Sequence, residues 1–245
     1  MQWFEDEEFW RTFYPWIFRE RRLQAAPEEV EQVLALSGIH EGAVLDVCCG
    51  PARHSVLLAQ KGFRVTGVDR SPFLLNKARE RAAGVEIEFV QSDVREFLRP
   101  GAFDLALNLF TSFGYFATRE EDLALLRNVR ANLKTGGVFI IDVMGRERVA
   151  AMPARVSWDE SPDGEILIDR AEILPGWTQV RSHWMLVKGE RARRFVFNLN
   201  LYSGQELTAA LEKAGFTDVR IFGSLTGTPY DASATRLVAR AVARG

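Results

Sequence analysis

The sequence predicts an α/β fold: a seven-stranded, mostly parallel sheet with an antiparallel last strand, plus a small antiparallel β-meander inserted late in the chain. Two observations predict it. Short apolar runs alternate with helical stretches as far as Val143, and strands separated by helices form parallel sheets with helices on both faces. After Gly145 the alternation gives way to extended stretches joined by short turns, which is typical of antiparallel hairpins.

The expected strands of the main sheet are short apolar runs bounded by turn or helix signals. In chain order they cover residues 43–48, 64–68, 86–91, 103–109, 138–143, 218–222 and 235–242. Helices are expected between them at 55–61, 72–82, 119–133 and 205–214. Ser71 before Pro72 is typical of a helix start, as is Ser203, while Gly62 and Gly215 should end the helices before them. The last two strands should pair antiparallel to each other.

The meander should contain four strands and lie over the main sheet. The extended stretches are 156–160, 165–173, 178–188 and 193–201. The chain therefore divides into an N-terminal helical lid (1–38), a ligand-binding domain (39–145 and 203–245) and an inserted antiparallel subdomain (146–202).

The N-terminal segment is rich in aromatic residues. Phe9, Phe13 and Trp16 share a helical face, and we expect Pro15 to interrupt that helix. Pro27 should lie in the first turn of a second helix that ends before Gly38. These aromatic side chains either clamp the helices to the domain or form a lid over a cationic ligand, since aromatic faces attract cations.

Composition excludes several classes of function. The net charge of −2 lacks the basic excess that binding to a nucleic-acid backbone requires. The two cysteines, Cys48 and Cys49, are adjacent and offer neither a disulfide framework nor zinc-site spacing, so we expect a reducing compartment and no metal. The acidic, aromatic N-terminus has no signal-peptide pattern, and we expect a cytoplasmic protein without a membrane segment.

Ligands of open parallel sheets bind beyond the carboxyl ends of the strands. Small residues at positions 48, 50 and 52, after the first strand, let the backbone approach a ligand, and the following helix offers free N–H groups. Asp69 ends the second strand and can accept hydrogen bonds from two ribose hydroxyls, and Asp93 is placed to accept from an adenine amino group. An aromatic loop, residues 108–116, follows the fourth strand.

These ordered motifs resemble the class I S-adenosylmethionine-dependent methyltransferases, with a Rossmann-like methyltransferase fold, over about residues 43–143 and the closing helix and strand pair. The loop Ser-Phe-Gly-Tyr-Phe at 112–116 and the inserted meander are similar to the bacterial small-molecule branch. The resemblance implies S-adenosylmethionine as cofactor and S-adenosylhomocysteine as product. It implies that the cofactor is held by Asp46, Cys48, Gly50, Ala52, Asp69, Arg70, Asp93, Val94, Asn108 and Leu109.

The loop after the first strand departs from the family pattern. Cys48 and Ala52 stand where glycines are common, although both are small enough for a cofactor to bind. We expect Ala52 to adopt a negative φ, because a left-handed alanine is strained.

The resemblance implies methyl transfer to a nitrogen or oxygen atom of a small molecule. Because the cofactor is already activated, the protein mainly aligns donor and acceptor, and a base is optional. The candidate catalytic residues are Tyr115, Tyr14 and His183, the last because either His183 or Trp184 should face the cleft. The candidate substrate residues are Phe113, Tyr115, Trp16 and Tyr202. Four arginines have two interpretations: they are either solvated surface groups or ligands of a substrate carboxylate. They are Arg22, Arg155, Arg181 and Arg194.

Two other classes stay open. One is a protein that binds S-adenosylmethionine without catalysis, and the other is a nicotinamide-dependent oxidoreductase, although its G-x-G-x-x-G pattern is absent around Gly50. No Asn-Pro-Pro-Tyr run follows the fourth strand, which argues against methylation of nucleic-acid bases. The expected partner is a small-molecule acceptor, not a nucleic acid or a membrane, and the expected state is a monomer or homodimer.

Overall fold

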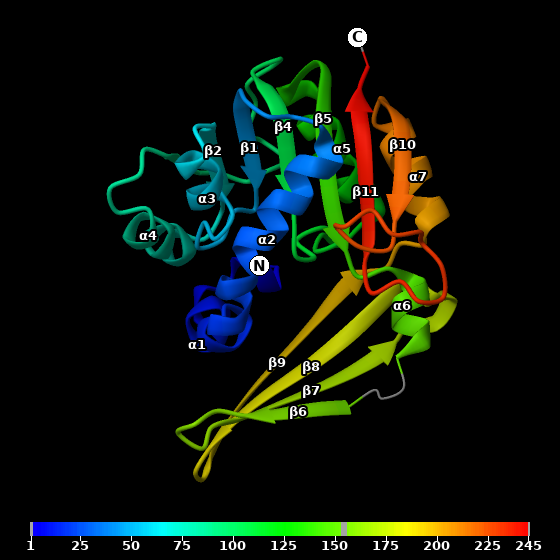
Figure 1. Cartoon of the computed structure of the whole chain (residues 1–245). Helices are drawn as coiled ribbons and strands as arrows, with labels where there is room; N and C mark the ends of the chain where they lie inside the picture. The colour runs from blue at the N-terminus through cyan, green and yellow to red at the C-terminus, as the bar shows by residue number, and fades with distance from the viewer. Residues whose placement is uncertain (1, 153–155, 245) are drawn as a thin grey trace.

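The computed structural model describes residues 2–152 and 156–244, which build two sheets (Figure 1). The main sheet has seven strands in the order β10-β11-β5-β4-β1-β2-β3. Their bounds are β1 Ala43–Val47, β2 Arg64–Asp69, β3 Glu88–Gln91, β4 Phe103–Asn108, β5 Leu133–Val143, β10 Phe216–Phe222 and β11 Leu237–Ala243. Neighbouring strands from β3 to β5 are parallel, and β11 is antiparallel to both β5 and β10. The predicted seven-stranded sheet with an antiparallel last strand is confirmed.

Helices cover both faces of this sheet (Figure 1). Their bounds are α1 Glu7–Ile17, α2 Glu20–Ser37, α3 Ser55–Gln60, α4 Pro72–Arg81, α5 Arg119–Asn132, α6 Arg146–Ala151 and α7 Gly204–Lys213, with short 3-10 helices at Trp3–Glu5 and Pro175–Trp177. Successive residues of β1 enter different cores: Val44 packs in a cluster with α2 and α3, and Leu45 in a cluster with α5 and α7. Burial on both faces explains why the central strands are continuous apolar runs.

Side-chain caps set the helix starts where the sequence predicted them. The Ser71 hydroxyl accepts from the Leu74 N–H, and the Ser203 hydroxyl accepts from the Glu206 N–H. The Glu206 carboxylate in turn accepts from the Ser203 N–H, which completes a capping box. These caps fix the entry of the chain into α4 and α7.

The second sheet is the predicted meander, with the order β6-β7-β8-β9. Its strands are β6 Val156–Glu160, β7 Ile166–Ile173, β8 Gln179–Lys188 and β9 Arg191–Asn200. Contrary to the expectation that it lies over the main sheet, it extends away from the carboxyl edge of that sheet (Figure 1). The reason is its partner: Leu186 and Phe197 on its apolar face pack against Phe9, Phe13 and Trp16 of α1.

Two proline predictions were wrong. Pro15 lies inside α1, and Pro27 lies inside α2, which begins seven residues earlier at Glu20. A proline inside a helix costs about 3 kcal/mol. Here the buried aromatic face of α1 and the buried residues Ala26 and Val30 on either side of Pro27 offset that cost.

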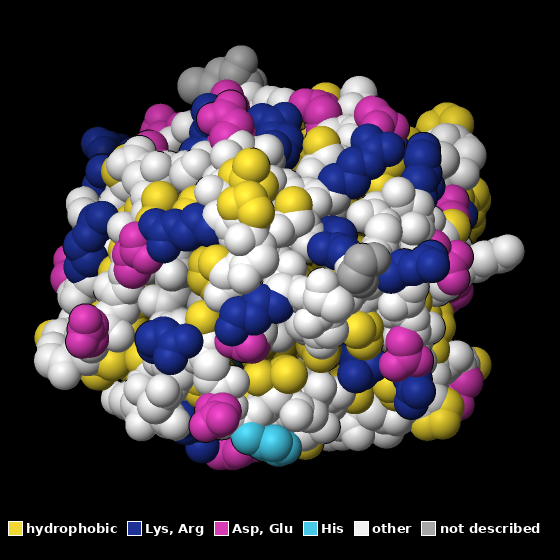
Figure 2. Space-filling view, turned by 90° about the horizontal axis from the view of Figure 1, so that it is seen from above, with side chains coloured by type: hydrophobic (Ala, Val, Ile, Leu, Met, Phe, Trp, Pro, Cys, Tyr) yellow, Lys and Arg dark blue, Asp and Glu magenta, His cyan; other side chains and the backbone are white. Residues whose placement is uncertain are grey.

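Charged side chains are mixed over the face at the amino ends of the parallel strands. Figure 2 shows lysine and arginine side chains interspersed with aspartate and glutamate there. Among the helices of the described residues, none is both long and apolar enough to cross a membrane.

Candidate active site

A cavity of about 300 Å³ lies where the carboxyl ends of β1, β2 and β4 meet the N-terminal helices and the second sheet. This volume is at the lower end of the range for small-molecule sites. Its floor consists of the loops that follow the parallel strands, and its cover consists of the 3-10 helix Trp3–Glu5, α1 and the inner face of β8 and β9. The position agrees with the rule that places ligands beyond the carboxyl ends of parallel strands.

The loop after β1 is built from left-handed residues. Cys48, Gly50 and Ala52 have φ values of 60°, 54° and 58°. The prediction of a negative φ for Ala52 was therefore wrong. Its fully buried backbone is held in place, because its N–H donates to the Cys49 carbonyl at 3.0 Å and its carbonyl accepts from the Val56 N–H at 3.1 Å. These bonds stabilise a conformation that costs an alanine about 1–2 kcal/mol.

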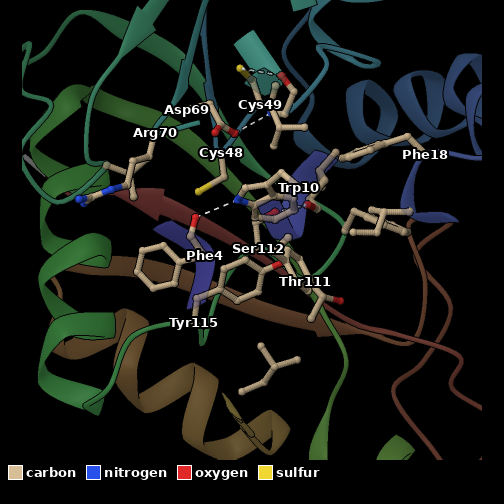
Figure 3. A pocket seen from close by; sticks show the side chains of 18 of the residues that line it. Phe4, Trp10, Phe18, Cys48, Cys49, Asp69, Arg70, Thr111, Ser112 and Tyr115 are labelled. Atoms are coloured by element: carbon tan, nitrogen blue, oxygen red, sulfur yellow. Dashed lines mark hydrogen bonds between the residues drawn. The ribbon is translucent and has the colours of Figure 1, made fainter. Parts of the chain in front are cut away.

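Asp69 at the end of β2 ties two loops together (Figure 3). Its carboxylate accepts from the Gly50 N–H at 2.8 Å and from the Ser71 N–H at 2.9 Å. Burial raises the pKa of Asp69 to about 6, although the two backbone hydrogen bonds act in the opposite direction. The carboxylate is thus fixed and desolvated at the wall of the cavity.

Asp46 and Asp93 flank Asp69 on the neighbouring strand ends. Asp46 is buried and accepts a hydrogen bond from the Ser55 hydroxyl at the start of α3. Asp93 pairs with Arg70 at 2.8 Å and with Arg95 at 2.7 Å. Burial alone would raise the pKa of Asp93, but the hydrogen bonds and charge of the arginines outweigh it and hold that pKa below its usual value.

The loop after β4 contains a second left-handed segment. Phe110 and Thr111 have φ values of 65° and 60°. Asp142 at the end of β5 holds both: its carboxylate accepts from the Phe110 N–H at 3.1 Å, and its carbonyl accepts from the Thr111 N–H at 2.9 Å. The fully buried Asn108 donates to the Val47 carbonyl at 3.1 Å, and its Oδ1 has no hydrogen-bond partner among the described residues.

An aromatic wall closes the other side of the cavity. Trp10 lines the cavity together with Cys48 and donates its indole N–H to the Phe4 carbonyl at 2.8 Å (Figure 3). The ring of Trp3 lies 4.6 Å from the rings of Tyr115 and Phe197. Burial raises the pKa of Tyr115 far above its ordinary value, so its phenol is protonated at neutral pH. The wall is therefore apolar, with Tyr115 as a neutral polar group.

Most of the predicted cofactor residues line this one cavity. They are Asp46, Cys48, Gly50, Asp69, Arg70, Asp93, Val94 and Leu109. Ala52 and Asn108 do not line it but shape its loops, Ala52 through backbone hydrogen bonds and Asn108 through its side-chain amide, which donates to the Val47 carbonyl. A Cβ on Gly50 would lie 3.4 Å from the Phe18 ring, so at this point the loop after β1 and the N-terminal segment approach each other closely.

Five of the predicted catalytic or substrate residues do not line the cavity, and only Tyr115 does. Tyr14 packs between Phe18 and Phe73. Trp16 is buried against the second sheet and donates its indole N–H to Glu165 at 2.9 Å.

Phe113 and Tyr202 are also buried, with ring centroids 5.0 Å apart, and the Tyr202 hydroxyl donates to Asp122 at 2.7 Å. Both belong to the core that supports the loop after β4.

His183 was also placed wrongly. Alternate residues of a strand face opposite sides, and it is Trp184 that lines the cavity. His183 lies on the other face of β8, with its Nε2 3.4 Å from Glu172. The prediction that one of this pair faces the cleft is confirmed, with Trp184 as that residue.

Several cavity residues were not predicted from the sequence. Trp3 and Trp10 of the wall belong to the aromatic N-terminal segment but were not predicted as site residues, and Phe110, Arg53 and Arg236 were not singled out. The signal for Phe110 was its place in the aromatic loop, whereas Arg236 joins the site only through the pairing of β11 with β5. Of the four arginines considered as carboxylate ligands, Arg22 lines the cavity, Arg181 and Arg194 do not, and Arg155 lies outside the described residues.

Comparisons with known proteins agree with this architecture. The family described as "Methyltransferase domain" matches residues 44–137. The chain is 27% identical to the putative methyltransferase YqeM of Bacillus subtilis over 207 residues, which cover 82% of this chain and 84% of that protein.

Two solved structures share the fold. One is an S-adenosylmethionine-dependent methyltransferase from Clostridium acetobutylicum, with a TM-score of 0.79 and 16% sequence identity. The superposition covers 97% of this chain and 98% of that chain. The S-adenosylmethionine-bound amino pentose methyltransferase CalS10 from Micromonospora echinaspora has a TM-score of 0.69 at 25% identity, with 90% of each chain covered.

Residues 44–137 thus match a methyltransferase domain, and the likeness in sequence and fold to methyltransferases extends over most of the chain. The sequence-based prediction of the family and of an enzyme is confirmed. The two alternatives, a non-catalytic binding protein and a nicotinamide-dependent oxidoreductase, are set aside for the same reason.

Proposed function

We propose that this enzyme methylates a nitrogen or oxygen atom of a small molecule inside the cavity described above. The observation that carries the proposal is the division of one cavity into two halves. Carboxylates and left-handed backbone of the β1, β2 and β3 ends form one half, and the aromatic wall forms the other. The name of the amino pentose methyltransferase among the similar structures supports a small acceptor.

The carboxylate half fits the cofactor. Asp69 is placed to accept hydrogen bonds from the ribose hydroxyls, since each of its oxygens has an acceptor site beyond the backbone bond it already makes. The left-handed loop at Cys48 and Gly50 offers close backbone approach to the amino-acid part, and Asp93 with Val94 would border the adenine. Bound S-adenosylmethionine supplies an activated methyl group on a sulfonium.

The aromatic half would exclude water and align the acceptor. Trp3, Trp10 and Trp184 line the cavity, and aromatic ring faces favour a cationic centre. Alignment and exclusion of water are the main contributions that a protein makes when the transferred group is already activated. Tyr115 lies in this half as a neutral phenol and would orient the acceptor by a hydrogen bond.

A screen for methyl transfer tests the proposal. The purified enzyme is incubated with methyl-labelled S-adenosylmethionine and a panel of small amines, amino sugars, phenols and carboxylic acids. We expect label in at least one of these products, detected by mass spectrometry. Label found only in added protein or nucleic acid would contradict a small-molecule acceptor.

The cofactor affinity should fall at acidic pH. Because the pKa of Asp69 is raised to about 6, its carboxylate is ionised at pH 7.5 and mostly protonated at pH 5. A protonated Asp69 loses acceptor capacity for the ribose, so the affinity for S-adenosylhomocysteine should drop about tenfold between pH 7.5 and pH 5. Calorimetric titrations over this range measure the effect. The variant D69N, which cannot titrate, should bind weakly at both pH values, and a full pH dependence in D69N would refute the assignment.

The hydroxyl of Tyr115 should contribute orientation and not proton abstraction. We expect Y115F to lower kcat for the acceptor found in the screen by less than about tenfold, because a general base contributes about 10²–10⁴. The ring and its contact with Trp3 are kept in this variant. Steady-state kinetics from pH 7 to 9 are the measurement. A loss of more than about a hundredfold, with a pH profile that flattens in Y115F, would identify Tyr115 as the base instead.

A further inference from the structure

Three arginines surround the ring of Phe110 at the cavity. The guanidinium carbon of Arg22 lies 4.2 Å from the ring centroid, that of Arg53 5.0 Å and that of Arg236 5.8 Å. They come from α2, from the loop after β1 and from the residue before β11, and all line the cavity. Segments far apart in the sequence thus bring three positive charges to one aromatic residue.

Two of the three arginines already have carboxylate partners. Arg53 forms an ion pair with Glu29 and donates to the Arg22 carbonyl at 3.1 Å. Arg236 makes two hydrogen bonds of 2.6 Å with the carboxylate of Asp142, the same residue that holds the Phe110 backbone. These two guanidinium groups are neutralised within the protein.

Arg22 has no such partner. One of its nitrogens donates to the Ile17 carbonyl, and no carboxylate lies within ion-pair distance of it among residues 2–152 and 156–244. Burial lowers the pKa of Arg22 to about 10, and the nearby charges of Arg21, Arg53, Arg19 and Arg236 act in the same direction. A partly buried cation without a counterion is costly, so the site is electrostatically incomplete.

The strand order indicates which ligand completes it. The cofactor-binding carboxylates lie at β1, β2 and β3, on one side of β4. Arg236 precedes β11, which lies beyond β5 on the other side of β4. In Figure 3, Thr111, the residue after Phe110, and Asp69 lie on different sides of Trp10. Arg236 and Thr111 thus reach the cavity from the side of β4 that lies opposite to these carboxylates, whereas Arg53 reaches it from the loop after β1.

We propose that Arg22 binds a carboxylate of the methyl acceptor, with Arg236 and the Phe110 ring positioning its guanidinium. The inference rests on the proposed small-molecule function and names the substrate class: a small molecule with one carboxylate. A planar guanidinium matches the two oxygens of a carboxylate, and a single unpaired cation balances a single negative charge. The carboxylate of the cofactor has the same chemistry, so a test must separate the two sources.

Binding measurements on the complex with S-adenosylhomocysteine separate them, because the cofactor site is then filled. The probes are matched pairs of acids and their amides: glycine and glycinamide, 4-hydroxybenzoate and 4-hydroxybenzamide, indole-3-acetate and indole-3-acetamide. The proteins are the wild type, R22M and the control R21M, whose exposed side chain lies outside the cavity. Calorimetry gives the affinity of each probe and of S-adenosylhomocysteine itself.

We expect at least one acid to bind the wild-type complex more tightly than its amide, by about ten- to a hundredfold. R22M should abolish this difference and R21M should keep it, while the affinity for S-adenosylhomocysteine stays within about threefold in both. Acids that bind no better than amides would overturn the proposal. So would an R22M variant that loses S-adenosylhomocysteine affinity but keeps the difference between acid and amide, since Arg22 would then bind the cofactor. Selective acid binding without methylation of any acceptor would instead count against the proposed function alone.

Discussion

Replacement of Asp69 by alanine is expected to weaken the binding of S-adenosylhomocysteine by more than about a hundredfold. A hydrogen bond to a charged group contributes about 1.5–3 kcal/mol, and Asp69 is placed to accept two from the ribose. The same carboxylate also accepts from the N–H groups of Gly50 and Ser71, so D69A releases the loop that approaches the amino-acid part of the cofactor. Calorimetric titration of the folded variant measures the loss.

Two further variants serve as controls for D69A. D69N keeps the shape and one acceptor oxygen and should lie between the wild type and D69A. D163A removes an exposed carboxylate in the turn between β6 and β7, which lies outside the cavity, and should bind like the wild type. An affinity of D69A within about threefold of the wild type would show that the ribose lies elsewhere.

The substitution G114A is expected to lower the free energy of unfolding by about 2–5 kcal/mol. Gly114 has a φ of 91°, and a Cβ there would lie 2.6 Å from the carbonyl oxygen of Asn200. The left-handed conformation costs an alanine about 1–2 kcal/mol, and overpacking adds about 1–3 kcal/mol. The contact cannot relax easily, because the Asn200 N–H donates to the Gly114 carbonyl at 2.7 Å and its side chain donates to the Phe116 carbonyl at 3.0 Å.

A second glycine separates the cost of the left-handed backbone from the cost of overpacking. Gly164 has a φ of 77°, but a Cβ added there would meet no atom within 4 Å beyond its chain neighbours. G164A therefore carries only the backbone cost of about 1–2 kcal/mol. Chemical denaturation of both variants measures the difference. Because Tyr115 follows Gly114 in the sequence, G114A should also reduce methyl transfer under conditions where it is folded. Equal destabilisation of the two variants would mean that the contact between the loop after β4 and β9 is not tight.

The main sheet was predictable because its signals are local. Apolar runs, the caps at Ser71 and Ser203 and the glycine ends of helices all lie within a few residues of the elements they define. The helices through Pro15 and Pro27 were not predictable, because burial against distant segments outweighs the local cost of each proline. The left-handed Ala52 was missed for a similar reason, since bonds within its loop override its own preference.

The two halves of the site differ in how far their residues could be predicted from local sequence. The carboxylates of the proposed cofactor half follow strands directly, so their positions can be read from the sequence. The aromatic wall and the arginine cluster are assembled from the N-terminus, the second sheet and β11, and the alternation along β8 alone did not tell whether His183 or Trp184 faces inward. The unpaired charge of Arg22 depends on which carboxylates surround it in space and has no counterpart in the sequence.

A crystal structure of the complex with S-adenosylhomocysteine tests the central claim most directly. The account predicts that the ribose hydroxyls donate to Asp69, that the amino-acid part lies at the Cys48–Gly50 backbone and that the sulfur faces the aromatic wall. A ligand bound outside this cavity, or a ribose that does not contact Asp69, would contradict it.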